Sequence, residues 1–205
     1  MENPLFHTLL RVAAFATFIR VGWCVAGFLR MFGNHARARI SNWGLVQLLV
    51  VPEAYLLGLA GLLLWLQLDG GGTATPFALA SALLGAALSG AGLLVSVWTF
   101  VAFPSIGTGH YVSEGQVLVS RGPFAWVRHP TYLGVLMLWF GLGIAFRSLP
   151  VLLAAVFYGV VYQRYARHEE EMMAAAFGDA YITYCTQVGR FLPRSLRPFR
   201  AESAT

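Results

Sequence analysis

The feature that most constrains this chain is a series of apolar runs on the scale of a bilayer crossing, which takes about 20 residues as a helix. The chain of 205 residues is 58% hydrophobic and only 11% charged. A soluble domain of this size usually carries about 25% charged residues. We therefore predict an all-α fold, a polytopic membrane helical bundle with about five transmembrane helices.

The last two predicted spans form a short helical hairpin. The five spans cover roughly residues 8–29, 43–68, 77–103, 131–146 and 151–163. Since a helix rises about 1.5 Å per residue, the fourth and fifth are short for a full crossing. A tight turn is expected at Arg147–Pro150, and the fifth helix is expected to continue through residues 164–176 as a cytosolic helical segment.

Small residues predict where two of these helices pack. Ser81, Gly85 and Ser89 recur every four residues in the third span, so they line one face. Such faces allow close helix packing in lipid.

The positions of the arginines predict the orientation. The net charge is +5, and the arginines lie mostly at the ends of apolar runs, which favours contact with lipid headgroups over nucleic acid. By the positive-inside rule, the 30–42 loop, the 104–130 connection and the tail are cytoplasmic. The N-terminus is then outside and the C-terminus inside. Cys24 and Cys185 are too few for a disulfide framework.

Two polar blocks flank the hairpin. Residues 118–134 read LVSRGPFAWVRHPTYLG, and residues 167–194 read RHEEEMMAAAFGDAYITYCTQVGRFLPR. Pro130 suits the first turn of a helix, so Arg128 and His129 lie at a helix N-terminus whose free N–H groups attract anions. Arg128 can bind a carboxylate bidentately, and Gly134 would let another group approach closely. Glu169–Glu171 offer acceptors across the hairpin, and the region from Tyr181 and Tyr184 to Arg190 is expected to close the site. The blocks together predict a charged site at the membrane surface.

Each polar feature also has a simpler interpretation. An Arg-His-Pro at a membrane interface can snorkel and begin a helix, and three consecutive glutamates commonly form a solvated helix face. An acid inside a span, such as Glu53, is by default a functional hypothesis. For Glu53 two alternatives stay open, a structural pairing with Arg20 and a role in an acceptor pocket.

The order and spacing of the blocks resemble a known family. LVxxGPFxxxRHPxYxG followed by EE-x6-FG-x2-Y-x2-Y-x5-R-x2-P, within residues 116–194, resembles the isoprenylcysteine carboxyl methyltransferase family. That family belongs with the phospholipid N-methyltransferases among integral-membrane methyltransferases. The resemblance implies S-adenosylmethionine as cofactor, S-adenosylhomocysteine as product, and a lipophilic small-molecule or lipidated acceptor. Residues 1–103 would be a three-helix membrane region and residues 104–205 the cofactor-binding catalytic region.

The resemblance also assigns residues. Gln116–Val119 would be strand-like backbone beside the cofactor, and Arg164 would position the acceptor, in competition with Arg167. The implied catalytic residues are Arg164 and Glu169. The implied cofactor-binding residues are Gln116, Val117, Leu118, Val119, Arg128, His129, Tyr132, Gly134 and Glu170.

The leading hypothesis is therefore methylation of a lipophilic acceptor, with the oxygen of a carboxylate or phenol preferred over nitrogen. S-adenosylmethionine carries its own activated methyl group, so no metal is expected. The alternative is an NADPH-dependent membrane reductase of the sterol-reductase type, against which the glutamate run argues. A third possibility is a non-enzymatic scaffold or transporter, in which Arg128→Ala and Glu169→Ala would change only stability.

Overall fold

The structure is a computed structural model, and it describes residues 3–31, 38–41, 43–70, 74–103, 111–113 and 116–199. Its α-helices are α1 (Pro4–Met31), α2 (Trp43–Leu66), α3 (Pro76–Ala102), α4 (Pro130–Ala145), α5 (Leu149–Phe177) and α6 (Asp179–Gln187). The short elements are the strands β1 (Ala38–Ser41) and β2 (Tyr111–Ser113) and the 3₁₀ helices η2 (Gln67–Gly70) and η4 (Gly122–Ala125).

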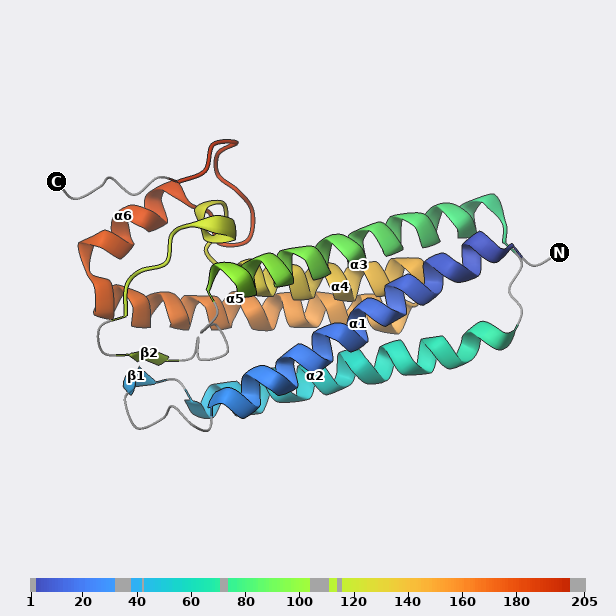
Figure 1. Cartoon of the computed structure of the whole chain (residues 1–205), viewed down its shortest axis with the longest axis horizontal. Helices are drawn as coiled ribbons and strands as arrows, with labels where there is room; N and C mark the ends of the chain where they lie inside the picture. Colours follow the sequence, from blue (N-terminus) through green and yellow to red (C-terminus); the bar gives the residue numbers. More distant parts are fainter. Residues whose placement is uncertain are drawn as a thin grey trace.

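Five long helices run up and down one long axis (Figure 1). The N-terminus, the α2–α3 connection and the α4–α5 turn lie at one end of the bundle. The strands, η4 and α6 lie at the other end, so the two polar blocks share that end. This arrangement is the one that the arginine positions require, while which end faces the cytoplasm stays a prediction.

The helices have the composition of membrane spans. Three segments are long and apolar enough to cross a bilayer, namely Pro4–Gly22 of α1, all of α3 and all of α5, and the shorter apolar segments are Pro52–Leu66 and Pro130–Ala145. Large apolar side chains such as Leu94, Val101 and Phe157 are exposed, as expected for side chains that face lipid. The predicted helical membrane bundle is confirmed.

The lengths of α4 and α5 explain how the charged residues leave the membrane. With 16 residues, α4 is about 24 Å long, whereas α5, with 29 residues, is about 44 Å long. The hydrocarbon core is about 30 Å thick. The C-terminal turns of α5 therefore extend beyond it, which confirms the expected continuation of the fifth helix.

The hairpin between α4 and α5 turns as tightly as predicted. Arg147 has a positive φ of 52°, the left-handed conformation that commonly ends a helix. The amide of the next residue, Ser148, donates to the Gly143 carbonyl at 2.9 Å. This bond lies at the C-terminal end of α4, and α5 begins at the next residue, Leu149.

Small residues bring α3 and α4 into backbone contact. A Cβ on Gly141 would lie 2.7 Å from the Ser89 backbone nitrogen, and one on Gly134 would lie 2.8 Å from the Gly92 carbonyl oxygen. The predicted small-residue face is confirmed, although Ser81 lies at its edge and is only partly buried. The buried residues of α3 are Ala78, Ala82, Gly85, Ala86, Ser89, Gly92, Ser96 and Thr99.

One local prediction is wrong. Residues 116–120 form neither helix nor strand, and the strand in this connection is β2, which pairs antiparallel with β1. The family resemblance implied strand-like backbone at residues 116–119, but Leu118 instead packs against the buried cluster of Tyr181, Tyr184 and Val188. Residues 32–37 and 104–110 of the predicted cytoplasmic connections lie outside the described residues, and the division at residue 103 stays a prediction.

Candidate functional site

Glu170 is the centre of a charged cluster at the end of α5. Its Oε1 accepts hydrogen bonds from Arg128 Nε at 3.0 Å and from Arg190 Nε at 2.9 Å, and Arg190 also donates to Oε2. His129 Nε2 lies 3.2 Å from the same Oε1. Hydrogen bonds between charged groups are about twice as strong as neutral ones. Glu170 thus ties the segment before α4 to the segment after α6.

Arg128 anchors the C-terminal segment. Its side chain is 7% exposed, and its Nη1 donates to the carbonyls of Cys185, at 3.0 Å, and Val188. The Arg128 amide donates to the Gly189 carbonyl at 2.8 Å, and the His129 amide donates to the Arg190 carbonyl at 3.1 Å. The donors of Arg128 therefore go to the protein itself, and binding of a cofactor carboxylate by this residue stays a prediction.

His129 lies between two carboxylates. Its Nδ1 is 3.4 Å from Glu169 Oε2, while its Nε2 faces Glu170. Burial lowers the pKa of His129, but the hydrogen bonds and the negative charges of Glu169 and Glu170 act against burial, and the net pKa is raised. The cluster therefore favours the imidazolium form.

Below His129, aromatic rings form the floor of the cluster. The rings of His129 and Tyr132 stack at 5.4 Å, and those of Tyr132 and Tyr162 stack at 4.7 Å. Tyr132 is also within hydrogen-bonding reach of Glu169, which is 9% exposed. Pro130 begins α4, so His129 lies at the N-cap and Tyr132 in the first turn of the same helix.

The run of three glutamates divides between site and solvent. Glu169 and Glu170 face His129, whereas the Glu171 side chain is 76% exposed and lies 3.4 Å from His168 on the same helix. The solvated-face interpretation therefore holds for Glu171. It does not hold for the other two.

The short helix α6 closes over η4. Gly178, with a φ of +56°, makes the turn from α5 into α6, a conformation that glycine adopts without steric cost. The Tyr184 hydroxyl then donates to the Phe124 carbonyl at 2.6 Å. Burial raises the pKa of Tyr184 above its usual value, so this hydroxyl is a neutral donor. The predicted closing role of the 181–190 region has this physical basis.

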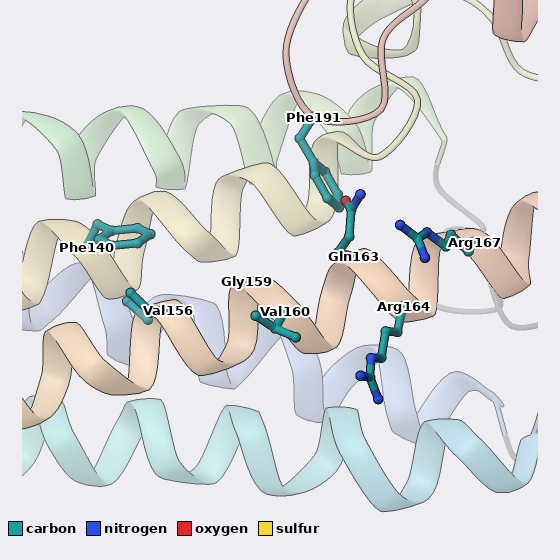
Figure 2. A pocket seen from close by; sticks show the side chains of 9 residues that line it. Phe140, Val156, Gly159, Val160, Gln163, Arg164, Arg167 and Phe191 are labelled. Carbon is teal, nitrogen blue, oxygen red and sulfur yellow. The ribbon is translucent and has the colours of Figure 1, made fainter.

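An apolar groove lies along one face of α5 (Figure 2). Its volume is about 530 Å³, and Phe140 of α4 and Phe191 of the C-terminal segment lie at its two ends. Arg164 and Arg167 lie at the end nearer Phe191. The remaining lining residues are Ala155, Val156, Gly159, Val160 and Gln163.

Phe191 connects the groove to the charged cluster. It lines the groove, and its ring lies 6.0 Å from the His129 ring. In Figure 2 the Arg167 side chain points to the same side of α5 as Gln163, toward Phe191. The Arg164 side chain points to the opposite side of the helix. In the part of the chain that the structure describes, neither arginine forms a hydrogen bond or an ion pair. Arg164 therefore lines the groove without pairing with Glu169.

Of the predicted site residues, five come together. These are Arg128, His129, Tyr132, Glu169 and Glu170.

Three other predicted positions lie differently. Gly134 does allow a close approach, but the group that approaches is the α3 backbone around Gly92. The Val117 side chain is 77% exposed, and Leu118 packs on α6. Their proposed contacts with a cofactor stay predictions.

Sequence reasoning singled out the region of Arg190 without giving that side chain a role. The available signal was the spacing of Arg190 after Tyr181 and Tyr184 in the second motif. Phe191 and Gln163 carried no signal, because no pattern distinguishes them from other residues at a membrane edge.

Comparisons with known proteins point to one family. The family described as phospholipid methyltransferase matches residues 80–180, which include most of α3, all of α4, and His129, Glu169 and Glu170. The protein-S-isoprenylcysteine O-methyltransferase of Saccharomyces cerevisiae is 34% identical over 81 residues, which are 38% of this chain and 33% of that protein. The cobalt-zinc-cadmium resistance protein CzcN of Cupriavidus metallidurans is 30% identical over 182 residues, 87% of this chain and 74% of that protein.

The name of the second relative refers to metal resistance. Within the described residues, no group of three or more His, Cys, Asp or Glu side chains is arranged to hold a metal ion.

Proposed function

Because the chain belongs to the family of integral-membrane methyltransferases that includes the isoprenylcysteine and phospholipid methyltransferases, we propose that it transfers a methyl group from S-adenosylmethionine to a lipophilic acceptor. The observation that carries this proposal is the position of Phe191, which contacts both His129 of the charged cluster and the apolar groove. A polar cofactor and an apolar acceptor have to meet at such a boundary.

The chemistry of the cluster fits the cofactor. S-adenosylmethionine, when bound, supplies an electrophilic methyl group on a sulfonium. Its ammonium group suits the carboxylates of the cluster, and its cationic and aromatic parts suit the face of Phe191. Arg190 is the cation best placed for its carboxylate, since 23% of that side chain is exposed, against 7% for Arg128. The backbone of Gln116–Val119 would border the same space.

The groove fits the acceptor. An apolar chain would lie along Val156, Gly159 and Val160 on the lipid-exposed side of α5, with its polar end toward Phe191. The arginines at that end favour an anionic head, a carboxylate or a phenolate. Arg167 points toward Phe191 and Arg164 away from it, so we assign the closer contact to Arg167 and a rim contact to Arg164.

The chain's own residues would align the acceptor and keep water away from it. A carboxylate acceptor is already nucleophilic and needs no base. A phenol would have to lose its proton, and Glu169 is the better acceptor of that proton because the raised pKa keeps His129 protonated. Oxygen methylation is preferred over nitrogen methylation because the C-terminal motif is more similar to the isoprenylcysteine branch of the family.

Calorimetry with the purified full chain tests the cofactor. S-adenosylhomocysteine is expected to bind in the micromolar range, and NADPH is expected not to bind. Binding of NADPH in place of S-adenosylhomocysteine would indicate a reductase and contradict the proposal, as would the absence of binding by either.

A pair of variants tests the acceptor site. Arg167→Ala is expected to raise the acceptor KM by about tenfold, the effect of losing about 1.4 kcal/mol, and to leave S-adenosylhomocysteine affinity unchanged. Arg164→Ala is expected to have a smaller effect in the same direction. Arg197→Ala is the matched control, because Arg197 is exposed in the tail. Equal KM values for all three variants would remove the groove from the proposal.

The acceptor can be identified by following the transferred methyl group. Membranes supplied with cofactor carrying an isotopically labelled methyl group are expected to contain a labelled lipophilic product. Release of the label as methanol in mild alkali identifies a methyl ester, whereas a phenol ether or a methylamine retains it. Labelled amine would contradict oxygen methylation.

The same reaction favours a cytoplasmic position for the end of the bundle that carries α6. This is the orientation that the arginines predict. A reporter fused to the C-terminus, active only in the cytoplasm, tests it, and a reporter that is active only outside would overturn it.

A further inference from the structure

Glu53 is a buried acid that the proposed reaction does not use. It lies in α2 with an exposure of 1%, and its Oε1 accepts a hydrogen bond from Trp139 Nε1 of α4 at 2.7 Å. The carboxylate is also within hydrogen-bonding reach of the Tyr162 hydroxyl of α5, and it interacts electrostatically with Arg20 of α1. A direct pairing with Arg20 stays a prediction, because an electrostatic interaction requires no contact between the two side chains. One side chain joins all four helices.

A row of aromatic rings leads from Glu53 to the charged cluster. Trp139 stacks on Tyr158 with ring centroids 5.3 Å apart and planes 20° from parallel. Tyr158 contacts Tyr162 at 6.2 Å, and Tyr162 stacks on Tyr132 at 4.7 Å. Tyr132 in turn stacks on His129 with the two planes 7° apart. The row therefore begins at a hydrogen bond within the membrane and ends at the residue that faces Glu169 and Glu170.

The hydrogen bond with Glu53 fixes the first ring of this row. The indole has a single N–H, and without water in the bilayer core a turned ring would leave that donor unsatisfied. The stacked neighbours have few alternatives, because Tyr158, Tyr162 and Tyr132 are all buried and buried side chains are close-packed. A change in the orientation of the Trp139 ring would therefore change the position of the Tyr132 ring.

We infer that Glu53 is a positioning residue for the cofactor site. By holding Trp139 and Tyr162, it fixes the aromatic floor on which His129 rests, and it thereby sets the affinity of the site. An acid within a membrane span is costly. The positioning role explains why an acid is present, because an apolar side chain could fill the same space but could not accept these hydrogen bonds. The inference rests on the proposed function, since the affinity concerned is that for S-adenosylhomocysteine.

The test compares variants of the purified full chain by calorimetry with S-adenosylhomocysteine. Glu53→Leu removes both acceptor oxygens and is expected to weaken binding about 3- to 10-fold, as for other residues coupled to a site through packed side chains. Glu53→Gln retains an oxygen that accepts from Trp139 and is expected to bind within about twofold of the unaltered chain. A double variant, Glu53→Leu with Trp139→Phe, is expected to bind no more weakly than Glu53→Leu, because both changes break the same bond.

Leu57→Ala is the matched control for stability. Leu57 lies one turn further along α2, is fully buried and packs in the same core, so its loss lowers thermal stability without removing an acceptor. It is expected to leave the affinity unchanged. The inference is overturned if Glu53→Leu binds normally, if Leu57→Ala weakens binding as much as Glu53→Leu does, or if Glu53→Gln fails to restore binding. Absence of binding to the unaltered chain would instead contradict the proposed function.

Discussion

The two central carboxylates of this protein, Glu170 and Glu53, are stabilised in different ways. Glu170 lies at the end of the bundle, where two guanidinium groups and an imidazole meet it. Glu53 lies between the helices, where a neutral indole N–H donates to it and Arg20 acts electrostatically. Loss of Glu170 leaves Arg128 and Arg190 without their carboxylate partner, whereas loss of Glu53 leaves chiefly neutral donors and one arginine. We therefore expect removal of the Glu170 carboxylate to lower thermal stability more than removal of the Glu53 carboxylate does.

The largest effect is expected for Glu170→Ala. This change leaves Arg128 and Arg190 without their shared carboxylate, and breaking a buried ion pair by removing one partner costs about 3–5 kcal/mol. The segment after α6 then loses its link through Arg190 to α5, while the backbone bonds to residues 128 and 129 and the Arg128 bond to the Val188 carbonyl remain. We expect a large fall in the thermal unfolding temperature, together with loss of S-adenosylhomocysteine binding.

The neighbouring residue supplies the control. Glu171→Ala removes a carboxylate from the same helix turn, but that side chain is 76% exposed. A surface substitution of this kind is expected to change the free energy of unfolding by no more than about 0.5 kcal/mol. Similar losses for the two variants would mean that the cluster at Glu170 contributes no more than a solvated charge.

The next largest effect is expected for Trp139→Phe. The change keeps a ring beside Tyr158 but removes the donor to Glu53, and a buried group that loses its hydrogen-bond partner costs about 1–3 kcal/mol. Thermal unfolding in detergent measures the loss. Trp98→Phe is the control, since Trp98 of α3 is 47% exposed toward lipid. A larger loss for Trp139→Phe than for Glu170→Ala would reverse the proposed order of the two carboxylates.

The same comparison explains what the sequence could predict. The limits of the helices followed from the lengths of the apolar runs, and His129, Glu169 and Glu170 followed from two motifs flanking a hairpin. The contact between Glu53 and Trp139 joins residues 86 apart with no shared motif. The acid was visible as an anomaly, but nothing in the sequence indicated its partner on α4.

Two residues that were predicted to bind the cofactor have unforeseen partners within the protein. Arg128 was expected to bind a ligand carboxylate, yet its donors meet Glu170 and the backbone carbonyls of Cys185 and Val188. Carbonyl groups are present at every residue, so the sequence gives no signal for such docking. Gly134 was expected to allow a close approach, but periodicity did not show that α3 makes it.

A smaller effect is expected for Arg190→Lys. The guanidinium donates to both oxygens of Glu170, while an ammonium is a compact charge that does not reproduce this fork. The charge is retained, so the expected loss is about 1 kcal/mol, the net value of one hydrogen bond. Arg194→Lys is the control, because Arg194 is exposed. An unchanged unfolding temperature for Arg190→Lys would show that charge without geometry satisfies Glu170.

The smallest effect is expected from titration of His129, because a neutral imidazole still donates one hydrogen bond to the carboxylates. The folded chain raises the pKa of His129, since Glu169 and Glu170 outweigh the opposing effect of burial. Stability gained from the imidazolium is then fully present below the unfolded value, about 6.5, and is lost as pH rises through the raised folded pKa.

A comparison with His129→Gln isolates this contribution. The difference in unfolding temperature between the unaltered chain and the variant is expected to be largest near about pH 6 and to shrink as the pH rises. Since the two chains share every other titrating group, the remaining pH dependence cancels in the difference. A difference that grows with pH would mean that burial outweighs the two carboxylates and that the cluster holds a neutral histidine. Glu170 would then rest on its two arginines, and His129 would become the better candidate base for a phenol acceptor.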